Sequence, residues 1–307
     1  MNPAATTAPP ERGYVLISPC RNEAAYMRQT LDSVLAQTLR PALWVLVDDG
    51  STDQTPAILA EVARHHDWIR VVTRQDRGHR AVGPGVIDAF YAGYATIQPD
   101  EFEFLCKLDL DLRLPPRYFE RLVERMHADP RIATCSGKAY LEEHGQLVDE
   151  RHGDDTSLGM TKFYRVHCFQ AIGGFVHEVM WDGIDCHQCR MHGWLACSWD
   201  EPDLRFVHLR PMGSSQQGIH SGRMRHGYGQ YFMGTGLLYL AASALTRLDQ
   251  KPYLTGSLAI LWGWLWSALR RLPRYDNPTF RRFLHRYQQR VLRVGKQRAI
   301  DELTAAR

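Results

Sequence analysis

Residues 45–53 read VLVDDGSTD and residues 108–111 read LDLD, so both segments place carboxylates directly after a short apolar run. At the end of a buried parallel strand, such side chains project into a crevice, where α/β sheets bind their ligands. Two acidic clusters that face one crevice repel each other unless a cation lies between them. The two segments therefore predict a divalent metal ion bound together with a phosphorylated ligand.

Four apolar, β-rich runs recur at a spacing of about thirty residues, which is typical of βαβ units. They cover residues 14–18, 43–47, 69–73 and 102–108. Between the first two runs, Met27, Leu31 and Val34 repeat with the period of a helix. This alternation predicts an α/β layer fold with a mostly parallel sheet.

Composition and charge bound the class of protein. The 307-residue chain is 44% hydrophobic and 23% charged, which is typical of a globular protein. Its seven scattered cysteines, and a start without an apolar leader, favour reduced thiols and a cytoplasmic location. The net charge is +3, but residues 270–307 hold eleven Arg or Lys against three acidic residues, or +8, which leaves −5 for the remainder. The basic end is therefore expected to bind an anionic surface.

Four motifs in a fixed order carry a resemblance to a known family. They are ISPCRNE (residues 17–23), LDSVLAQT (residues 31–38), VDDGSTD (residues 47–53) and DLD (residues 109–111). Together they resemble glycosyltransferase family 2, over roughly residues 14–210, whereas a lone Asp-x-Asp would be weak evidence. The resemblance implies a GT-A fold, a Rossmann-like mostly parallel sheet with flanking helices. It also implies a nucleotide-sugar donor, Mg²⁺ or Mn²⁺, and inversion at the anomeric carbon.

The donor-binding residues that this resemblance implies lie mainly at strand ends. They are Pro19, Arg21, Glu23, Asp48, Asp49, Arg77, Arg80 and Asp109. Asp48 and Asp49 are expected at the nucleobase, because a carboxylate accepts hydrogen bonds from base N–H groups. Arg77 and Arg80 are expected near the donor diphosphate, because Arg grips phosphate with two parallel bonds. The alternative for these two arginines is a solvated basic loop.

The metal ligands are expected from Asp109 and Asp111, which alternate along a strand end and so face one side. One carboxylate would bind ribose and the other Mg²⁺ or Mn²⁺. The surrounding run is similar to that of dolichol-phosphate mannosyltransferases, but Arg113 stands where those enzymes have a glutamine. This difference leaves the third ligand open. His208 is a candidate, and the alternative is a structural histidine.

An inverting displacement needs a general base that takes the proton of the acceptor hydroxyl. The resemblance implies that this base lies downstream of GGF (residues 173–175). Asp182 and Asp185 are the candidates, one as base and the other as helix cap or acceptor contact, and the register with Gly193 favours Asp182. The single CHQC segment (residues 186–189) is weak evidence for zinc, because it lacks a second ligand pair with the usual spacing.

Four regions are predicted along the chain. They are a disordered tail (1–13), a nucleotide-sugar-binding lobe (14–114), an acceptor-binding lobe (115–222) and a C-terminal apolar and basic helical region that associates with membrane (223–307). Residues 252–269 carry no charge and hold three tryptophans, a composition typical of membrane interfaces. Their helical stretch of roughly 16 residues, or ~24 Å, is shorter than the ~30 Å hydrocarbon core, so an interfacial or re-entrant hairpin is expected.

The last part of this region has the pattern of a basic amphipathic helix, which is suited to lipid headgroups. Phe280, Leu284 and Tyr287 fall on one face, while Arg282 and Arg286 fall on others. The alternative is that the C-terminal helices are buried against the catalytic lobe.

The sequence therefore predicts an inverting, metal-dependent enzyme that transfers one sugar, with a UDP-sugar as the expected donor. The acceptor is expected to be a lipid-linked or glycan hydroxyl of the cell envelope, and the location peripheral or monotopic at the inner face of the cytoplasmic membrane. The Gln-x-x-Arg-Trp motif of processive synthases is absent, and no nucleic-acid partner is expected. The alternatives are a GT-A-like nucleotidyltransferase, against which Asp182 and Asp185 argue, and a non-catalytic sugar-nucleotide-binding or membrane scaffold protein.

Overall fold

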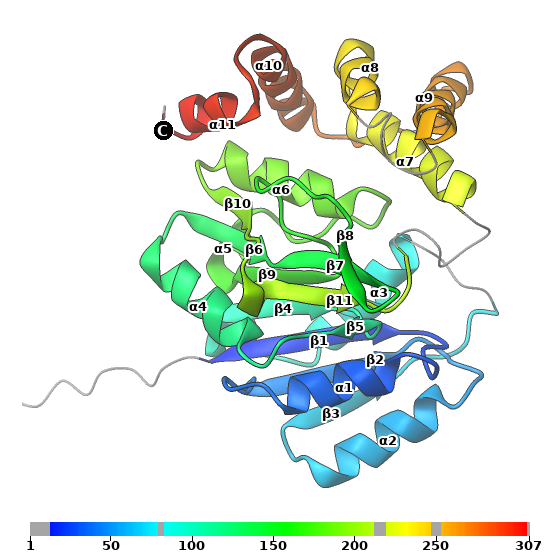
Figure 1. Cartoon of the computed structure of the whole chain (residues 1–307), viewed down its shortest axis with the longest axis vertical. Helices are drawn as coiled ribbons and strands as arrows, with labels where there is room; N and C mark the ends of the chain where they lie inside the picture. The colour runs from blue at the N-terminus through cyan, green and yellow to red at the C-terminus, as the bar shows by residue number, and fades with distance from the viewer. Residues whose placement is uncertain (1–12, 79–82, 212–218, 247–252, 306–307) are drawn as a thin grey trace, which may run out of the picture.

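The computed structural model describes residues 13–78, 83–211, 219–246 and 253–305 (Figure 1). A seven-stranded sheet in the order β10-β6-β9-β4-β1-β2-β3 lies at its centre. Its strands are β1 (Tyr14–Cys20), β2 (Leu43–Asp48), β3 (Ile69–Thr73), β4 (Phe104–Leu108), β6 (Ile132–Ser136), β9 (Thr161–Arg165) and β10 (Leu195–Ser198). Neighbouring strands are parallel except at β9, which is antiparallel to β4 and β6. The predicted mostly parallel sheet is confirmed.

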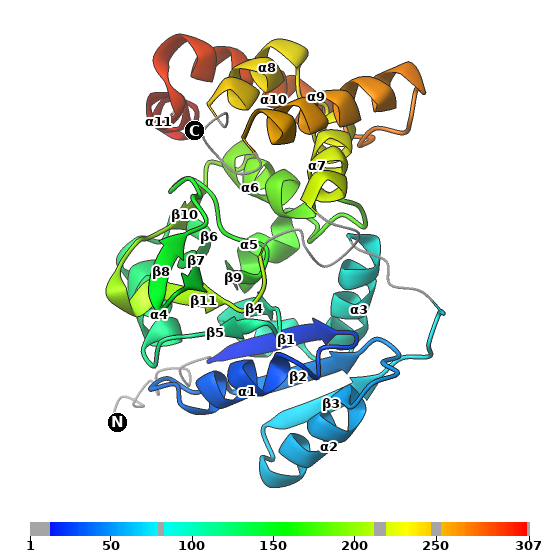
Figure 2. The same cartoon turned by 45° about the vertical axis from the view of Figure 1, so that its right-hand side comes forward.

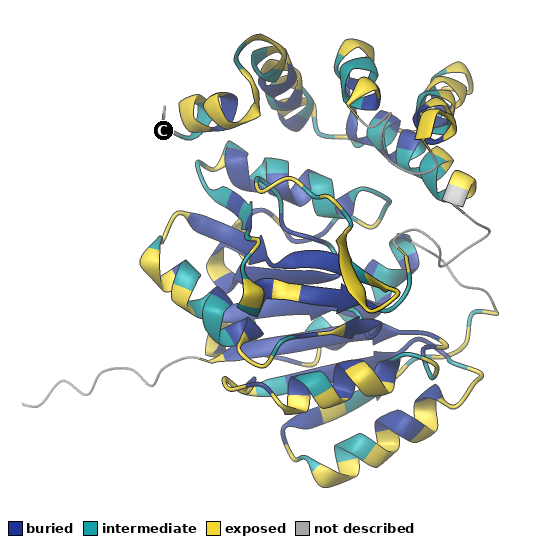
Figure 3. Cartoon of the chain, in the orientation of Figure 1, coloured by how far each residue is buried: buried dark blue, intermediate teal, exposed yellow. Residues whose placement is uncertain are grey.

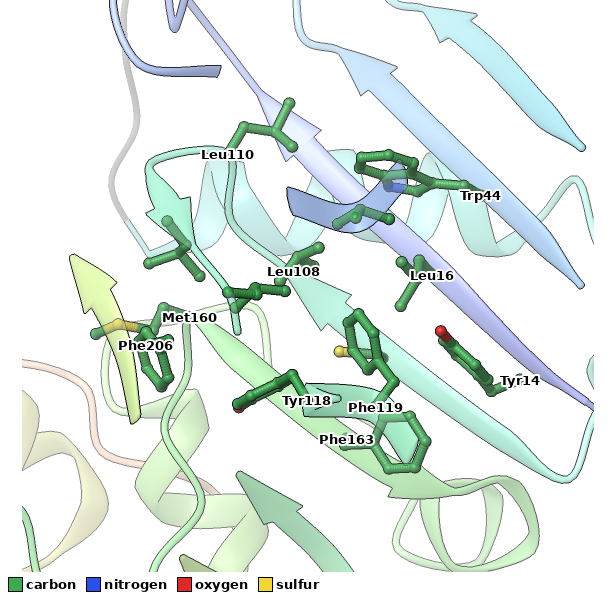
Figure 4. Close-up of a cluster of buried hydrophobic side chains, with 14 of the residues drawn as sticks. Tyr14, Leu16, Trp44, Leu108, Leu110, Tyr118, Phe119, Met160, Phe163 and Phe206 are labelled. Atoms are coloured by element: carbon green, nitrogen blue, oxygen red, sulfur yellow. The ribbon is translucent and has the colours of Figure 1, made fainter. Parts of the chain in front are cut away.

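One face of the sheet packs against α1 (Met27–Leu35), α2 (Thr55–His65) and α4 (Tyr118–Ala128). Figure 4 shows part of this core, in which Phe119 of α4 lies near Tyr14 of β1 and Phe163 of β9. Each large side chain fully buried here contributes roughly 1.5–3 kcal/mol relative to an exposed one. The alternation of side chains along β1 explains this face, because Tyr14 and Leu16 point to the same side.

The opposite face packs against α3 (Pro84–Tyr94), α5 (Val166–Ala171) and α6 (Trp181–Met191). Val15 and Ile17, which alternate with the residues of the first face, belong to this second core. The rings of Phe90, Phe169 and Phe175 meet edge to face within it. The result is a three-layer α/β/α arrangement in which the strand ends are left open at one edge.

A second sheet of four strands has the order β5-β11-β7-β8. It contains β5 (Leu112–Arg113), β7 (Lys138–Glu143), β8 (Gln146–Asp149) and β11 (Arg205–His208). Short 3₁₀ turns precede β4 (η1, Pro99–Glu101) and β11 (η2, Pro202–Leu204). The residue after β11 lies beside the acidic segment that follows β4, because Leu209 N donates a hydrogen bond to Asp111 O at 2.8 Å.

The two predicted lobes share one continuous sheet. Strand β4, from the predicted donor lobe, is hydrogen-bonded along its whole length to β9, from the predicted acceptor lobe. The predicted boundary at residue 114 therefore does not divide the protein into two separate cores. The donor-binding and acceptor-binding roles of the two lobes stay a prediction. Residues 1–12, most of the predicted tail, lie outside the described residues.

The C-terminal helices form a layer over α6, at the opposite end of the molecule from α2 (Figures 1 and 2). They are α7 (Ile219–Met233), α8 (Leu237–Leu245), α9 (Tyr253–Leu269), α10 (Pro278–Val294) and α11 (Lys296–Ala305). Within the described ranges, none of the helices combines the length and the apolar character that crossing a bilayer requires.

Helix α10 has clear local start and stop signals. Asn277 caps it by accepting a hydrogen bond from Phe280 N at 2.9 Å, and Gly295 ends it at a φ of +83°. Its apolar residues Phe280, Leu284 and Tyr287 pack into a core with Ile184 of α6. The interpretation of this face as a lipid-binding surface is wrong, because the face is buried against the catalytic lobe.

Helix α9 shows the opposite distribution. Its buried positions are Gly256, Ser257, Ile260, Gly263 and Ser267, of which all but Ile260 are small, whereas most of its large apolar side chains are exposed. A methyl group on Gly263 would lie 2.2 Å from Met224 O of α7, and one on Gly227 of α7 would lie 2.1 Å from Ile260 O. Glycine at both crossing points therefore allows the two backbones to touch.

Candidate active site

The end of β2 carries the first acidic pair. Asp48 and Asp49 are both buried, and Asp48 Oδ1 accepts a hydrogen bond from Ser51 N at 2.9 Å. Gly50 follows the pair at a φ of +70°, and a Cβ there would lie 2.4 Å from the Cα of Asp76. Only glycine fits this sharp exit from the strand. Pro19 lies alongside in β1, where it pairs in register with Val47.

Arginines surround Asp49. Arg74 Nη1 lies 2.6 Å from Asp49 Oδ1, and Arg77 pairs with the other carboxylate oxygen. Arg21 donates to the backbone carbonyl of Asp49 at 2.5 Å and pairs with Asp76 at 2.5 Å. Arg77 is thus brought to the predicted base-recognition residue, and its expected role at the diphosphate stays a prediction. Arg80 and His79 lie outside the described residues.

The side chain of Arg210 lies between carboxylates from two strand ends. Arg210 Nη2 lies 2.8 Å from Glu23 Oε1, after β1, and Arg210 Nε lies 2.5 Å from Asp111 Oδ2, after β4. The guanidinium also covers the ring of Tyr26 at 5.4 Å. The charges of Asp111 and Glu23 raise the pKa of Arg210 despite the opposing effect of burial, so it stays cationic.

His208 lies against the same carboxylate. Its Nε2 is 3.6 Å from Asp111 Oδ2, and its Nδ1 is 2.9 Å from Glu150 Oε2. Burial alone would raise the pKa of Asp111, but His208 and Arg210 outweigh it and lower this pKa to about 2. Burial would likewise lower the pKa of His208, but Asp111 and Glu150 raise it to about 9. Asp111 is therefore ionised in the folded protein.

The residues present suit a hard divalent cation. Asp111 Oδ1 is buried and has no hydrogen-bond partner among the described residues, and His208 directs its second nitrogen to the same side chain. Carboxylate oxygens suit Mg²⁺ or Mn²⁺, and the imidazole of His208 would join such a site only with its ring neutral. No group of three or more metal-binding side chains is preassembled in the described part of the chain. Arg210 instead occupies one oxygen of Asp111.

Arg113 does not belong to this cluster. It pairs with Glu142 at 2.5 Å on the second sheet, and both side chains are half exposed. Arg113 and Glu142 line an open cavity of about 520 Å³ together with His208 and Arg210. Arg113 therefore points its side chain at Glu142, while His208 is the residue that lies beside Asp111.

The two candidate bases have different surroundings. Asp185 is 1% exposed, pairs with Lys162 Nζ at 2.6 Å and accepts a hydrogen bond from Tyr164 OH at 2.5 Å. Burial raises the pKa of Asp185 to about 6, against the opposing effect of Lys162. Asp182 is half-buried, and a Cβ on Gly159 would lie 2.9 Å from its Oδ2. Asp182 is the more accessible carboxylate of the two.

Several residues of the site were not anticipated from the sequence. Lys107, Glu150, Lys162 and Arg210 each contact a predicted acidic or histidine residue. Lys107 interrupts an apolar run two positions before Asp109, so the alternation of strand side chains places both on one side. A lysine within an apolar strand was therefore a signal in the sequence from which this residue of the site could have been predicted. The thiols of Cys186 and Cys189 point inward against Lys162 and Tyr164.

Sequence comparisons identify relatives of the N-terminal part. The profile of Glycosyl transferase family 2 matches residues 15–180, more than half of the chain. The EpsH protein of Bacillus subtilis (strain 168) is 27% identical over 128 residues, 42% of this chain and 34% of that protein. A poly-beta-1,6-N-acetyl-D-glucosamine synthase of Staphylococcus aureus (strain COL) is 22% identical over 137 residues, 44% and 31% of the two chains. The chain spans about a third of the length of these relatives.

Solved structures share the fold at low identity. The mannosyltransferase PcManGT from Pyrobaculum calidifontis, in complex with GDP-Man and Mn²⁺, has a TM-score of 0.52 at 18% identity, covering 96% of this chain and 86% of that one. S. aureus TarS 1-349 with UDP-GlcNAc has a TM-score of 0.51 at 14% identity, covering 96% and 91%. GalNAc-T7 with UDP, GalNAc and Mn²⁺ has a TM-score of 0.59 at 13% identity, covering 96% and 57%. These likenesses confirm the predicted GT-A fold.

Proposed function

Because the chain belongs to glycosyl transferase family 2, we propose that it transfers a single sugar from a nucleotide-sugar donor to an acceptor hydroxyl, with inversion at the anomeric carbon. One observation carries the proposal. Carboxylates follow β2 and β4, which run parallel, and a third stands at the start of α6, beside the loop that enters β9. Acidic groups from three elements thus meet at the open edge of the sheet, where an α/β fold binds ligands.

On the donor side, Asp48 and Asp49 would accept hydrogen bonds from the nucleobase, with Pro19, Arg21 and Glu23 bordering that site. Arg77 and Arg80 would bring positive charge to the donor phosphates. We take UDP as the carrier. The solved neighbours were crystallised with UDP, UDP-GlcNAc or GDP-Man, so the fold accepts more than one base.

Asp109, Asp111 and His208 would hold Mg²⁺ or Mn²⁺. When bound, the ion stabilises the negative charge of the departing nucleoside diphosphate. Arg210 must then release an oxygen of Asp111 or share the carboxylate with the ion, because it occupies Oδ2. The Nε2 atom of His208 could bind the metal ion only when the imidazole ring is neutral. The contact between Nδ1 and Glu150 orients the ring.

On the acceptor side, we assign Asp182 as the general base. The acceptor oxygen bonds to the anomeric carbon, its proton passes to the Asp182 carboxylate, and the bond from the sugar to the diphosphate breaks. Asp185 is assigned to the fixation of α6, because both of its oxygens are already bonded inside the core.

The acceptor is proposed to be a lipid-linked or glycan hydroxyl of the cell envelope, reached at the inner face of the cytoplasmic membrane. The exposed side of α9 supports a membrane surface. Leu254, Leu258, Trp262 and Trp266 follow one another at helical spacing, and each is 41–57% exposed. Arg270 covers the Trp266 ring at 4.4 Å, so charge borders the apolar face as it does in interfacial helices.

Turnover of the purified protein tests the assignment. A panel of nucleotide sugars is screened with Mn²⁺ for a raised melting temperature, and the best donor is then followed for hydrolysis. Asp111→Ala is expected to abolish nucleotide stabilisation and hydrolysis. Asp182→Asn is expected to keep the stabilisation but lower turnover by ~10²-fold or more.

The matched control is Asp203→Asn, which removes an exposed carboxylate that pairs with Arg117 at 3.4 Å. It should behave as the unmodified protein. Binding without turnover in the unmodified protein would favour a non-catalytic scaffold protein, and equal turnover in Asp182→Asn would remove the base from the mechanism.

A further inference from the structure

Two buried lysines lie side by side in the central sheet. Lys107 of β4 and Lys162 of β9 are direct partners across the antiparallel pair, and their side chains are 2% and 0% exposed. Like charges on opposed strand positions destabilise a sheet, and a buried ammonium group costs free energy unless it is bonded. The bonds that these two groups make therefore determine what they do.

Lys107 joins the donor side to the loop beside the base. Its Nζ donates to Asp109 Oδ1 at 2.5 Å and to Gly159 O at 2.9 Å. Gly159 in turn touches Asp182, since a Cβ at this position would lie 2.9 Å from Asp182 Oδ2. One ammonium group thus fixes a carboxylate of the Asp-x-Asp motif and the backbone against which Asp182 rests.

Lys162 holds the start of α6. Its Nζ donates to the backbone carbonyl of Asp182 at 2.5 Å and to Asp185 Oδ1 at 2.6 Å. The Asp185 carboxylate neutralises the ammonium group, and its second oxygen accepts from Tyr164 OH. The residue that carries the proposed base is therefore anchored through its own backbone, which leaves its side chain to the site.

The indole of Trp181 lies close to both cations. Lys107 Nζ is 5.2 Å and Lys162 Nζ is 5.6 Å from its ring centre, both within cation–π range. The ring also packs edge to face on Phe175 at 4.6 Å. Because Trp181 directly precedes Asp182, the two lysines hold the base by the ring before it as well as by its carbonyl.

We propose that Lys107 and Lys162 are positioning residues for sugar transfer, which together hold Asp182 at a set place relative to Asp109. The proposal rests on the proposed function of those two carboxylates. Two ammonium groups and the carboxylates of Asp109 and Asp185 cancel in charge. A buried ion pair rarely adds stability over apolar residues of the same size, so geometry is the stronger reason for keeping these ions.

The acceptor half is tested by the double variant Lys162→Met with Asp185→Asn, which removes the ion pair and keeps the volume. We expect a melting temperature within a few degrees of the unmodified protein and an unchanged Kd for UDP with Mn²⁺ by calorimetry. Turnover of the donor identified by the thermal screen should fall roughly 10- to 100-fold, the cost of a misplaced reacting group.

The donor half is tested by Lys107→Met, which frees Asp109. Here the Kd for UDP with Mn²⁺ should rise about tenfold, together with a fall in turnover, so the two variants separate donor binding from the chemical step. Lys138→Met is the matched control. Lys138 is also buried and donates to His152 O at 2.8 Å, but it bonds none of these residues, and its loss should change stability without a change in kcat.

Each outcome of these experiments leads to a single conclusion. Turnover per folded molecule that is unchanged in the double variant overturns the proposal, whatever the melting temperature. If Lys107→Met does not fold, the double variant alone decides. If the unmodified protein neither binds UDP nor turns over any donor, the proposed function has failed, and that result is distinct from failure of the positioning role.

Discussion

At the scale of single residues, Gly50 sets the geometry of the strand end that we propose to recognise the nucleobase. Its left-handed backbone, at a φ of +70°, turns the chain sharply after Asp48 and Asp49. The space for a side chain is filled by the backbone of Asp76, which cannot move aside as a flexible side chain could. Asp76 also holds Arg21 at 2.5 Å, so a shift here would reach the donor site.

Gly50→Ala is therefore expected to destabilise the fold by roughly 2–4 kcal/mol, measured by urea unfolding. Gly145→Ala is the matched control. It has a similar φ of +78° but nothing within 4 Å of its would-be Cβ, so only the backbone strain of about 1 kcal/mol is expected. Equal losses in the two variants would show that the contact with Asp76 has no energetic weight.

Single residues also mark the limit of prediction from sequence. The place of Asp111 just after β4 could be predicted, because a carboxylate that follows a buried strand usually faces the ligand crevice, and its role as a metal ligand stays a prediction. Arg210 could not, because its partners Glu23 and Asp111 lie far from it in the chain and only the fold brings them together. Lys162 was equally hidden, since its partners Asp185 and Trp181 belong to a later helix.

At the scale of elements, the contact between α6 and α10 depends on an uncharged histidine. His187 lies 4.9 Å from the Tyr287 ring, and its Nδ1 accepts a hydrogen bond from Arg190 Nη1 at 3.1 Å. Burial, together with the charges of Arg190 and Lys296, lowers the pKa of His187 well below its usual 6.5. The folded state thus holds the neutral ring.

The sign of the pH effect follows from this lowered pKa. Above pH 6.5 neither state of His187 is protonated, and the contact has its full stability. Below pH 6.5 the unfolded chain takes up a proton that the folded chain refuses, so stability falls by at most about 1.4 kcal/mol per pH unit for this group.

Urea unfolding between pH 7.5 and 5.0 measures this effect. His187→Gln should have a flatter profile than the unmodified protein, and His127→Gln, whose ring is 54% exposed, serves as the control. Parallel profiles for all three proteins would exclude His187 as a source of acid sensitivity.

The elements themselves were largely predictable. β1, β2 and β4 could be placed from their apolar runs, because a strand buried on both faces leaves a continuous hydrophobic signal. β3 lies at the edge of the sheet and is only partly buried, but its β-branched residues still marked it. The roles of α9 and α10 could not be predicted in the same way. Helix α9 is uncharged throughout and α10 is apolar on one side, and a sequence does not say what covers such a surface. α10 packs against Ile184 of α6, whereas Leu258, Trp262 and Trp266 of α9 stay exposed in the described structure.

At the scale of the whole molecule, most of the exposed large apolar side chains belong to the C-terminal helices. Figure 3 shows exposed residues along the outward sides of α8 and α9, where Leu238, Leu245, Leu258 and Trp262 are 49–82% exposed. Arg270 and Arg271 follow directly. A helix with mostly small residues inside and large apolar side chains outside is the reverse of a water-facing helix, which supports the proposed membrane contact.

Co-sedimentation with phosphatidylglycerol vesicles tests this surface. The triple variant Leu258→Ser, Trp262→Ser, Trp266→Ser should reduce the bound fraction at least tenfold, because each half-exposed apolar side chain contributes on the order of 1 kcal/mol. The control is Leu147→Ser with Val148→Ser, which removes exposed apolar groups of β8. Full-length protein that stays in the supernatant, or a triple variant that still sediments, contradicts a membrane role.

The contacts of α6 set how the proposed active site is oriented relative to the C-terminal helices. Its first residue, Trp181, follows Met180, which lies against Gly229 of α7, and α7 packs on α9. The proposed nucleobase site at Asp48 lies at the end of β2, on the part of the sheet that α2 covers. On a bilayer, the soluble substrate would enter from the aqueous side and the anchored one from the lipid side. The two would never share an entrance, so the catalytic edge would work as a junction between two phases.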